Sequence, residues 1–210
     1  MIREGVGDAW QGPWAEIDVR DPGLLAEAAP PAGVILTGSA ARIADQSSWM
    51  LRVQERLQAL VEERVPIFGI CFGHQLLGVA LGGRSGPNPL GREIGTATFS
   101  LAVDDPLLGE APRSFPVATT HLDSVLELPP EAVALGSTPG EPQAAIRFGA
   151  RAWGVQFHPE FDAEVIGDYV SSRLETLRRE GFDPELLLAA RRETPESEDL
   201  LRRFVGHVHQ

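Results

Sequence analysis

One heptapeptide, Gly69 to Gln75, constrains this chain more than any other segment. It reads Gly-Ile-Cys-Phe-Gly-His-Gln and places the only cysteine, Cys71, between two glycines. An apolar run at 65–68 precedes it, and a helix-like apolar segment at 76–81 follows it. Glycines on both sides of a tight strand-to-helix turn avoid the clashes that Cβ atoms would make there. The segment therefore predicts a nucleophile elbow that projects the Cys71 thiol.

A thiol at such a turn also lies at the N-terminus of the following helix. The helix dipole and the N–H groups that have no partner within the helix favour a thiolate over a neutral thiol there. A lone cysteine without this context is most often a small buried hydrophobic residue. The context therefore predicts a reactive cysteine at position 71.

The amino-acid totals exclude several classes of function. The formal net charge is −12, which disfavours contact with nucleic acid or an anionic membrane surface, because both need clustered Lys and Arg. All 18 basic residues are arginine, so the chain has neither a Schiff-base lysine nor a P-loop lysine. We therefore expect no cofactor, no metal site, no nucleic acid partner and no membrane partner, and any ATP-driven step to need another subunit.

The compartment and the domain organisation follow from what the chain lacks. A single cysteine cannot form an internal disulfide, and the N-terminus has no hydrophobic signal region. No apolar stretch approaches the roughly 20 residues of a membrane span. These features are typical of a soluble protein of the reducing cytoplasm. We expect a single domain over 1–210, with a motif-bearing core at about 33–181 and a helical extension at 182–210.

Alternating apolar runs and helical periodicity predict an α/β fold. Strands and helices alternate in the first half, which indicates a mostly parallel central sheet with helices on both faces. The middle, 95–157, is rich in strands and indicates a small antiparallel portion. The predicted strands are 15–19, 33–37, 65–70, 95–103, 124–128, 144–148 and 151–157, and the predicted helices are 45–64, 162–181, 184–192 and 195–208.

A second motif supplies the groups that an elbow thiolate needs for proton transfer. The predicted strand 151–157 ends at His158, which would emerge at the same sheet edge as Cys71 if the two strands are parallel neighbours. Glu160 follows the stiff Pro159 and could accept the second ring N–H of the imidazole. The sequence therefore predicts a Cys71-His158-Glu160 triad.

Acyl transfer at such a triad also requires N–H donors for an oxyanion. The backbone N–H of Phe72, directly after the nucleophile, is one candidate. The N–H of Gly38, in the turn after the predicted strand 33–37, is the second. Glycine at position 38 would let a substrate approach the backbone closely.

On these residues the chain resembles the triad, or class I, glutamine amidotransferases, and within them the stand-alone proteins similar to the glutaminase domain of GMP synthase. The resemblance covers about 33–161 and rests on Gly-Ile-Cys-Phe-Gly-His-Gln followed by His-Pro-Glu. It implies a flavodoxin-like fold and hydrolysis of glutamine through a cysteinyl thioester. It further implies that Gln75 contacts the substrate and that His121, Leu122 and Asp123 line the amino-acid pocket.

Two segments depart from the family pattern. Family members usually open with an apolar strand, whereas the first predicted strand here begins near Ala15. Either the start is truncated or the sheet lacks that strand. The turn after 33–37 reads Thr-Gly-Ser where many relatives have a Gly-Gly pair, which leaves open whether the oxyanion hole is preformed.

Three functions remain open at the level of sequence. The first is hydrolysis of glutamine to glutamate and ammonia, with a synthetase subunit as the possible acceptor of ammonia. The second is hydrolysis of a γ-glutamyl peptide or conjugate by the same triad. The third is a non-catalytic regulatory subunit of a synthetase, against which the presence of Cys71, His158 and Glu160 argues.

Overall fold

The computed structural model describes residues 1–27 and 31–209. A seven-stranded sheet in the order β1-β2-β9-β8-β7-β4-β5 forms its centre, and a two-stranded sheet pairs β3 with β6. The strands are β1 (Val34–Leu36), β2 (Ile67–Ile70), β3 (Arg84–Pro87), β4 (Glu93–Leu101), β5 (Arg113–His121), β6 (Asp123–Glu127), β7 (Val133–Thr138), β8 (Glu141–Gly149) and β9 (Ala152–Val155).

The directions of the strands place the carboxyl ends of several of them, and the loops that follow, at the same end of the large sheet. The strands β1, β2 and β9 pair in parallel. The other pairs, from β9 through β8, β7 and β4 to β5, are antiparallel. Because two successive reversals restore a direction, β7 and β5 run the same way as β1, β2 and β9. The expected α/β fold, with strands mostly in one direction and a small antiparallel sheet, is confirmed.

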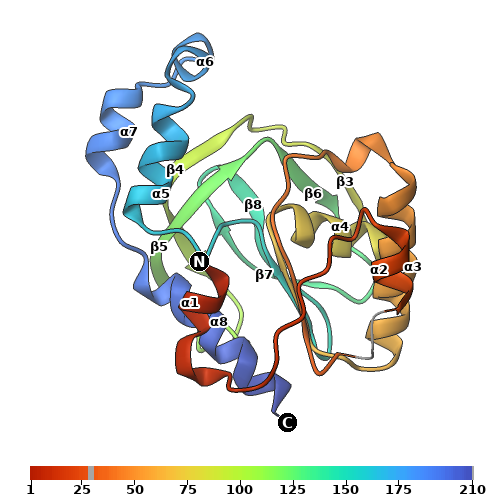
Figure 1. Ribbon diagram of the computed structural model, residues 1–210. Coiled ribbons are helices and arrows are strands. Elements are labelled where there is room, and N and C mark those ends of the chain that lie inside the picture. Colours follow the sequence, from red (N-terminus) through yellow and green to blue (C-terminus); the bar gives the residue numbers. More distant parts are fainter. Residues whose placement is uncertain (28–30, 210) are drawn as a thin grey trace.

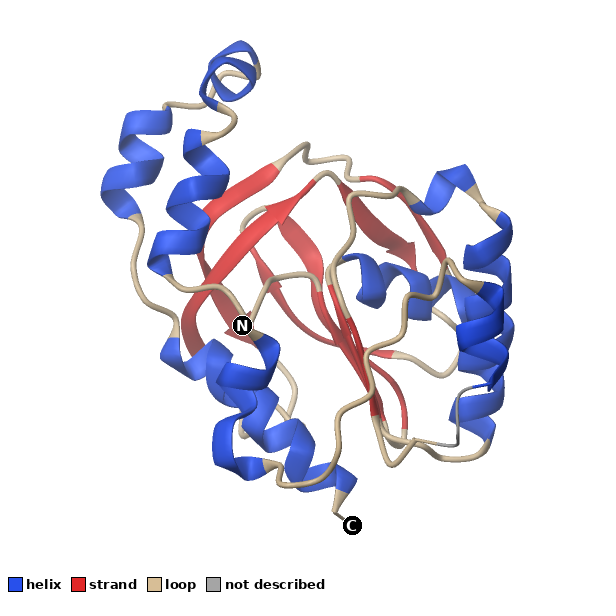
Figure 2. Ribbon diagram, in the orientation of Figure 1, coloured by secondary structure: helices blue, strands red, loops and turns tan. Residues whose placement is uncertain are grey.

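Helices cover both faces of the large sheet (Figures 1 and 2). The helices α3 and α4 pack on one face, and α1 and α8 pack together on the other. None of the helices in the described part of the chain is long and apolar enough to cross a membrane. The helices are α1 (Ile2–Val6), α2 (Pro22–Glu27), α3 (Ser48–Glu62), α4 (Phe72–Ala80), α5 (Ala163–Ser171), α6 (Leu174–Arg179), α7 (Pro184–Ala190) and α8 (Pro195–Val208).

Strand β2 separates two apolar cores. Ile67 packs in the cluster that contains Met50 and Leu57 of α3. Phe68 lies in the opposite cluster and stacks on Phe204 of α8, with ring centroids 5.5 Å apart. Successive strand residues point to opposite faces, so a strand buried on both faces needs an unbroken apolar run. The run at 65–70 supplies it and holds the nucleophile turn on a rigid strand.

Six of the predicted strands are present with small shifts of boundary, and one prediction is wrong. No strand forms at 15–19, where the chain is irregular and mostly exposed. The Asp18 carboxylate accepts a hydrogen bond from the backbone N–H of Arg20 at 3.0 Å. Such a local side-chain contact competes with pairing to a neighbouring strand. In the described residues the sheet therefore ends at β1 on this side, without the opening strand of the family pattern.

Three strands, β3, β5 and β7, are absent from the sequence-based prediction. Strand β3 lies within 82–91, a segment rich in glycine and proline that carries no apolar run. Strand β5 contains Pro116 and ends in Thr and His, but it lies at the sheet edge, where proline is tolerated. These segments have weak intrinsic strand preference, and their pairing partners decide their conformation.

The predicted helices are largely confirmed. The helix expected over 162–181 begins as predicted, since the Asp162 carboxylate accepts from the N–H of Val165 at 2.8 Å, and Gly181 follows with φ 88°. It is divided into α5 and α6 near Arg173, whose guanidinium bonds the carbonyl of Tyr169 at 3.0 Å. The short helices α1 and α2 are not predicted from sequence.

A close approach of α4 to β1 makes a first testable prediction. A Cβ atom at Gly73 would lie 2.5 Å from the carbonyl oxygen of Leu36. We expect Gly73→Ala to lower the free energy of unfolding by about 1–3 kcal/mol, because backbone must shift to relieve the clash. Urea denaturation measures this. The matched control is Gly206→Ala in α8, where a Cβ meets nothing within 4 Å; equal losses in the two variants would contradict the prediction.

Candidate active site

Cys71 occupies the turn between β2 and α4. Its backbone has φ 51° and ψ −106°, a left-handed conformation that is rare for residues other than glycine. Gly69 makes the turn possible, because a Cβ atom there would lie 2.7 Å from the carbonyl oxygen of Gly73. The turn thus has the geometry of a nucleophile elbow, and it is held by β2 on one side and α4 on the other.

His158 follows β9, the parallel neighbour of β2. Its Nδ1 lies 2.8 Å from Oε1 of Glu160. The Phe161 ring stacks on the imidazole with centroids 4.1 Å apart and fixes the plane of the ring. Because Glu160 occupies Nδ1, Nε2 is the nitrogen left to interact with Cys71.

The pKa of His158 is displaced upward. Burial by itself would lower it, but the adjacent Cys71 and Glu160 side chains outweigh burial and raise the pKa from 6.5 to about 10. A buried imidazolium is stable only beside a negative charge. The raised pKa therefore favours an imidazolium at His158, which lies beside the Glu160 carboxylate and Cys71.

We infer an ion pair between Cys71 and His158 from this raised pKa, and titration of His158 tests it. In Cys71→Ala the thiolate charge is gone while burial remains, so the pKa of His158 should fall by at least about one unit from its wild-type value. Titration of the ring nitrogens by NMR measures the shift. His74 is the internal control, because burial, followed by the charge of His121, lowers its pKa to about 3 and keeps it neutral in both proteins. An unchanged His158 titration would contradict the ion pair.

Gly38 and Phe72 border the reactive pair. A Cβ atom at Gly38 would lie 3.0 Å from Cε1 of His158 and 3.8 Å from Cβ of Cys71. Phe72 is the first residue of α4, so its N–H directly follows the nucleophile. Gly38 and Phe72, whose N–H groups the sequence predicts as oxyanion donors, thus come from different segments of the chain and both lie next to Cys71.

Gln75 and Gln156 are buried and form a chain of contacts that ends at the Cys71 sulfur. Gln75 Nε2 donates to the carbonyl oxygen of Asp123 at 2.8 Å and to Oε1 of Gln156 at 3.0 Å. Gln156 Nε2 lies 3.6 Å from the Cys71 sulfur. Gln156 is not among the site residues predicted from the sequence. Its spacing of two residues from His158 was the available signal, because residues i and i+2 of an extended chain face the same side.

The residues expected to line the amino-acid pocket take three different orientations. The His121 ring is buried, with Nδ1 3.1 Å from the carbonyl oxygen of Asp123 and Nε2 3.1 Å from Oε2 of Glu93. Leu122 is 46% exposed. The Asp123 carboxylate pairs with Arg42. The His121 ring therefore points into the protein interior, whereas the Leu122 side chain lies at the protein surface.

The Arg42–Asp123 pair joins two loops at the site. Arg42 Nη2 lies 2.6 Å from Oδ1 of Asp123, and Nε lies 3.1 Å from Oδ2. Such bidentate contacts fix geometry as well as charge. The pair connects the loop that follows Gly38 to the loop at 121–123. No local pattern could have predicted it, since the two residues are 81 positions apart.

A buried polar network holds residues 121–123. The two ring nitrogens of His121 lie 3.1 Å from the carbonyl oxygen of Asp123 and 3.1 Å from the Glu93 carboxylate. Glu93 also accepts from the Thr138 hydroxyl at 2.7 Å and from the Gly140 N–H at 3.0 Å. These bonds satisfy the carboxylate in the interior. Residues 121–123 are thus held on the sheet by the contact of His121 with Glu93, and on the loop after Gly38 by the contact of Asp123 with Arg42.

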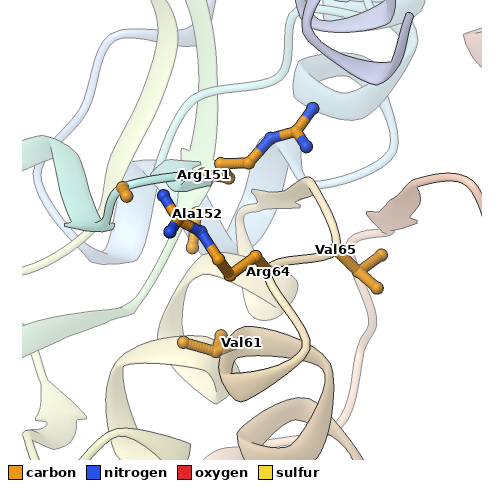
Figure 3. A pocket seen from close by; sticks show the side chains of 6 residues that line it. Val61, Arg64, Val65, Arg151 and Ala152 are labelled. Carbon is orange, nitrogen blue, oxygen red and sulfur yellow. The ribbon is translucent and has the colours of Figure 1, made fainter. Parts of the chain in front are cut away.

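A small cavity lies at the opposite end of the parallel strands (Figure 3). It measures about 30 Å³ and is lined by Arg64 and Val65 before β2 and by Arg151 and Ala152 at the start of β9, among others. The guanidinium of Arg151 donates to the carbonyl of His207 on α8. The volume suits one water molecule. The cavity lies at the start of β2 and β9, whereas Cys71 follows the end of β2, so the two sites are separate.

Sequence comparisons agree with the geometry. The sequence model of the family described as Glutamine amidotransferase class-I matches residues 15–173. The GMP synthase [glutamine-hydrolyzing] of Aeropyrum pernix is 36% identical over 180 residues, which cover 76% of this chain and 34% of that protein. Gamma-glutamyl peptidase 5 of Arabidopsis thaliana is 27% identical over 143 residues, which cover 66% of this chain and 57% of the peptidase.

A solved structure gives the same result. The glutamine amidotransferase of Thermotoga maritima superposes with a TM-score of 0.70 at 25% sequence identity, covering 84% of this chain and 77% of the other. The chain spans about a third of the length of the GMP synthases it matches. The family match covers well over half of the chain and confirms the resemblance carried by the two motifs. The chain belongs to the class I glutamine amidotransferase family.

Proposed function

We propose that this protein hydrolyses the side-chain amide of L-glutamine through a thioester on Cys71. One observation carries the proposal: Cys71 stands at a strained turn beside His158, and Nδ1 of His158 lies 2.8 Å from Glu160. A positioned thiolate, a proton carrier and a group that orients the carrier are what nucleophilic acyl transfer needs.

Acylation begins with attack of the thiolate on the amide carbon of the substrate. A C–S bond forms, and the carbonyl oxygen becomes an oxyanion that accepts hydrogen bonds from the N–H groups of Gly38 and Phe72. His158, held as imidazolium, donates its Nε2 proton to the departing nitrogen. Ammonia leaves as the C–N bond breaks, and the γ-glutamyl thioester remains on Cys71.

Deacylation reverses the roles. Neutral His158 takes a proton from water, the hydroxide attacks the thioester carbon, and glutamate leaves as the C–S bond breaks. Glu160 keeps the proton on Nδ1 throughout, so that Nε2 accepts and donates at the sulfur side. The resemblance assigns contacts with the substrate to Gln75, His121, Leu122 and Asp123. Of these residues Leu122 is exposed, and the other three are buried beside the site.

A second candidate keeps the chemistry and changes the leaving group. The similarity to gamma-glutamyl peptidases 5 and 3 of Arabidopsis thaliana, at 27% and 29% identity, favours it. The same pocket would hold the γ-glutamyl half, and an amine or a peptide would leave in place of ammonia. A non-catalytic subunit is the weaker candidate, because a degenerate copy has no chemical need for an oriented Cys71-His158-Glu160 set.

A substrate panel tests the proposal. Purified protein is incubated with glutamine, with γ-glutamyl dipeptides and with asparagine, and released ammonia, amine and glutamate are quantified. Release of glutamate and ammonia in equal amounts from glutamine is the expected result. Preference for every γ-glutamyl dipeptide over glutamine would select the second candidate. Absence of turnover with all γ-glutamyl compounds, and with added synthetase, would reject both.

A synthetase partner forms part of the proposal. The chain is similar to 34% of the length of the GMP synthase [glutamine-hydrolyzing] of Aeropyrum pernix. From this similarity we infer that ammonia released here passes to a synthetase acceptor in the reducing cytoplasm. Measuring glutamine turnover with and without a co-purified synthetase tests this, and a rate that does not change would argue for a free-standing hydrolase.

A further inference from the structure

A run of buried side-chain amides connects the pocket loop to the nucleophile. It begins at the carbonyl oxygen of Asp123, passes through Gln75 at 2.8 Å and Gln156 at 3.0 Å, and ends at the Cys71 sulfur at 3.6 Å. Gln75 is 4% exposed and Gln156 is 1% exposed. Water therefore does not compete for these contacts.

The direction of every contact in this run is set at its first member. A backbone carbonyl can only accept, so the Gln75 atom facing Asp123 is the amide nitrogen. The second hydrogen of that nitrogen requires another acceptor, so Gln156 turns its Oε1 toward Gln75. The remaining end of Gln156, its Nε2, is then the group that meets the sulfur. The opposite orientation would oppose two oxygens at Asp123.

We propose that Gln156 is a catalytic residue that donates an N–H to the Cys71 thiolate, and that Gln75 is a positioning residue that locks the orientation of the Gln156 amide. A donor at this position suits a thiolate, because anionic acceptors form the stronger hydrogen bonds. The proposal rests on Cys71 being the nucleophile of the proposed function.

The arrangement links substrate binding to the nucleophile. The carbonyl of Asp123 that orients Gln75 also lies 3.1 Å from Nδ1 of His121, and the Asp123 carboxylate pairs with Arg42. The loop that is proposed to hold the amino-acid half of the substrate is therefore the same loop that fixes the amide donor at the sulfur. Movement of this loop would therefore weaken the hydrogen bond from Gln156 to the Cys71 sulfur and change the shape of the proposed pocket at the same time.

Alkylation of Cys71 by iodoacetamide tests the proposal without any substrate. The rate constant is followed by mass spectrometry from about pH 4 to about pH 10, a range that spans shifted cysteine pKa values. In Gln156→Leu the midpoint of the profile should rise by about one pH unit, which lowers the thiolate fraction below the midpoint about tenfold. Because the nucleophilicity of a thiolate rises with its pKa, with a Brønsted slope of about 0.4–0.5, the plateau at high pH should increase about threefold and alkylation below the midpoint should slow about threefold.

The plateau separates this role from a structural one. Misplacement of the elbow would lower the rate at every pH, whereas loss of the donor raises the midpoint without lowering the plateau. The matched control is Gln58→Leu, which removes the amide that bonds the carbonyl of Ala80 and leaves the midpoint unchanged. His158, the charged group that interacts with Cys71, and Glu160 behind it are kept in every variant. An unmoved midpoint in folded Gln156→Leu would overturn the proposal.

Two further variants keep the test decisive if Gln156→Leu does not fold. Gln156→Glu has nearly the same shape but presents a carboxylate oxygen to the sulfur, so the midpoint should rise further than in Gln156→Leu. Gln75→Leu leaves the Gln156 amide free to turn, so a smaller rise is expected. An unmoved midpoint in folded Gln156→Glu would reject the donor. A shifted midpoint in a protein that hydrolyses no γ-glutamyl compound would support the donor and reject the proposed function alone.

Discussion

Cys71→Ala should reduce hydrolysis of glutamine by at least about 10³-fold, because no other group in the chain can form the thioester. Cys71 is the only cysteine of the sequence, so no neighbouring thiol can replace it. The change is measured as kcat for release of glutamate, with ammonia quantified in parallel. The residual rate should equal that of the buffer.

The fold should survive this substitution. The Cys71 side chain is 8% exposed and packs in the cluster that contains Phe68 and Val155. Alanine at this position keeps the same backbone conformation and removes one sulfur atom, so we expect the free energy of unfolding to change by about 1 kcal/mol or less. Full glutamine turnover by folded Cys71→Ala would sink the thioester mechanism and move the search to a different nucleophile.

His158→Gln should lower kcat by about 10²–10⁴-fold, the usual size of a lost general acid–base group. Two effects combine in this variant. The thiolate loses the positive charge that stabilises it, and the departing nitrogen loses its proton donor. Glutamine at position 158 has a size similar to that of histidine and retains a hydrogen-bonding end toward Glu160, so packing against Phe161 should change little.

A second readout distinguishes loss of the base from loss of the fold. Alkylation of Cys71 near pH 7 should slow in His158→Gln, since fewer molecules hold a thiolate. The matched control is His209→Gln, which removes an exposed histidine that follows the end of α8 and should leave both rates unchanged. Equal kcat values for His158→Gln and wild type would show that another group moves the proton.

The local parts of the site could be predicted because each rests on a short segment. The elbow needs an apolar strand, two glycines and a helix in succession, and all three lie within 65–81. His158 and Glu160 are two residues apart at a strand end, so one stiff proline between them is enough to make the carboxylate reach the ring. For such motifs the chain itself enforces proximity.

The contacts that hold the pocket could not be predicted in this way. Arg42 and Asp123 pair across 81 positions, and Gln75 and Gln156 also meet across 81 positions. No periodicity connects such residues. The strand predicted at 15–19 failed for a related reason, since its apolar alternation has no partner strand and a local contact of Asp18 prevails. Strand β5, with weak strand preference, forms because β4 pairs along its whole length.

The sequence by itself determined the chemistry available to this protein: one thiol at a strained turn, one imidazole at a strand end, and one carboxylate two residues beyond it. Backbone sterics and side-chain spacing act over a few residues, so a short segment of sequence is enough to specify each of these features. Only the tertiary structure decided which groups surround the sulfur, because the strand order places β9 beside β2 and the direction of β5 brings 121–123 to the same edge. At that edge burial by itself lowers the pKa of His158, and the neighbouring Cys71 and Glu160 outweigh burial and raise it.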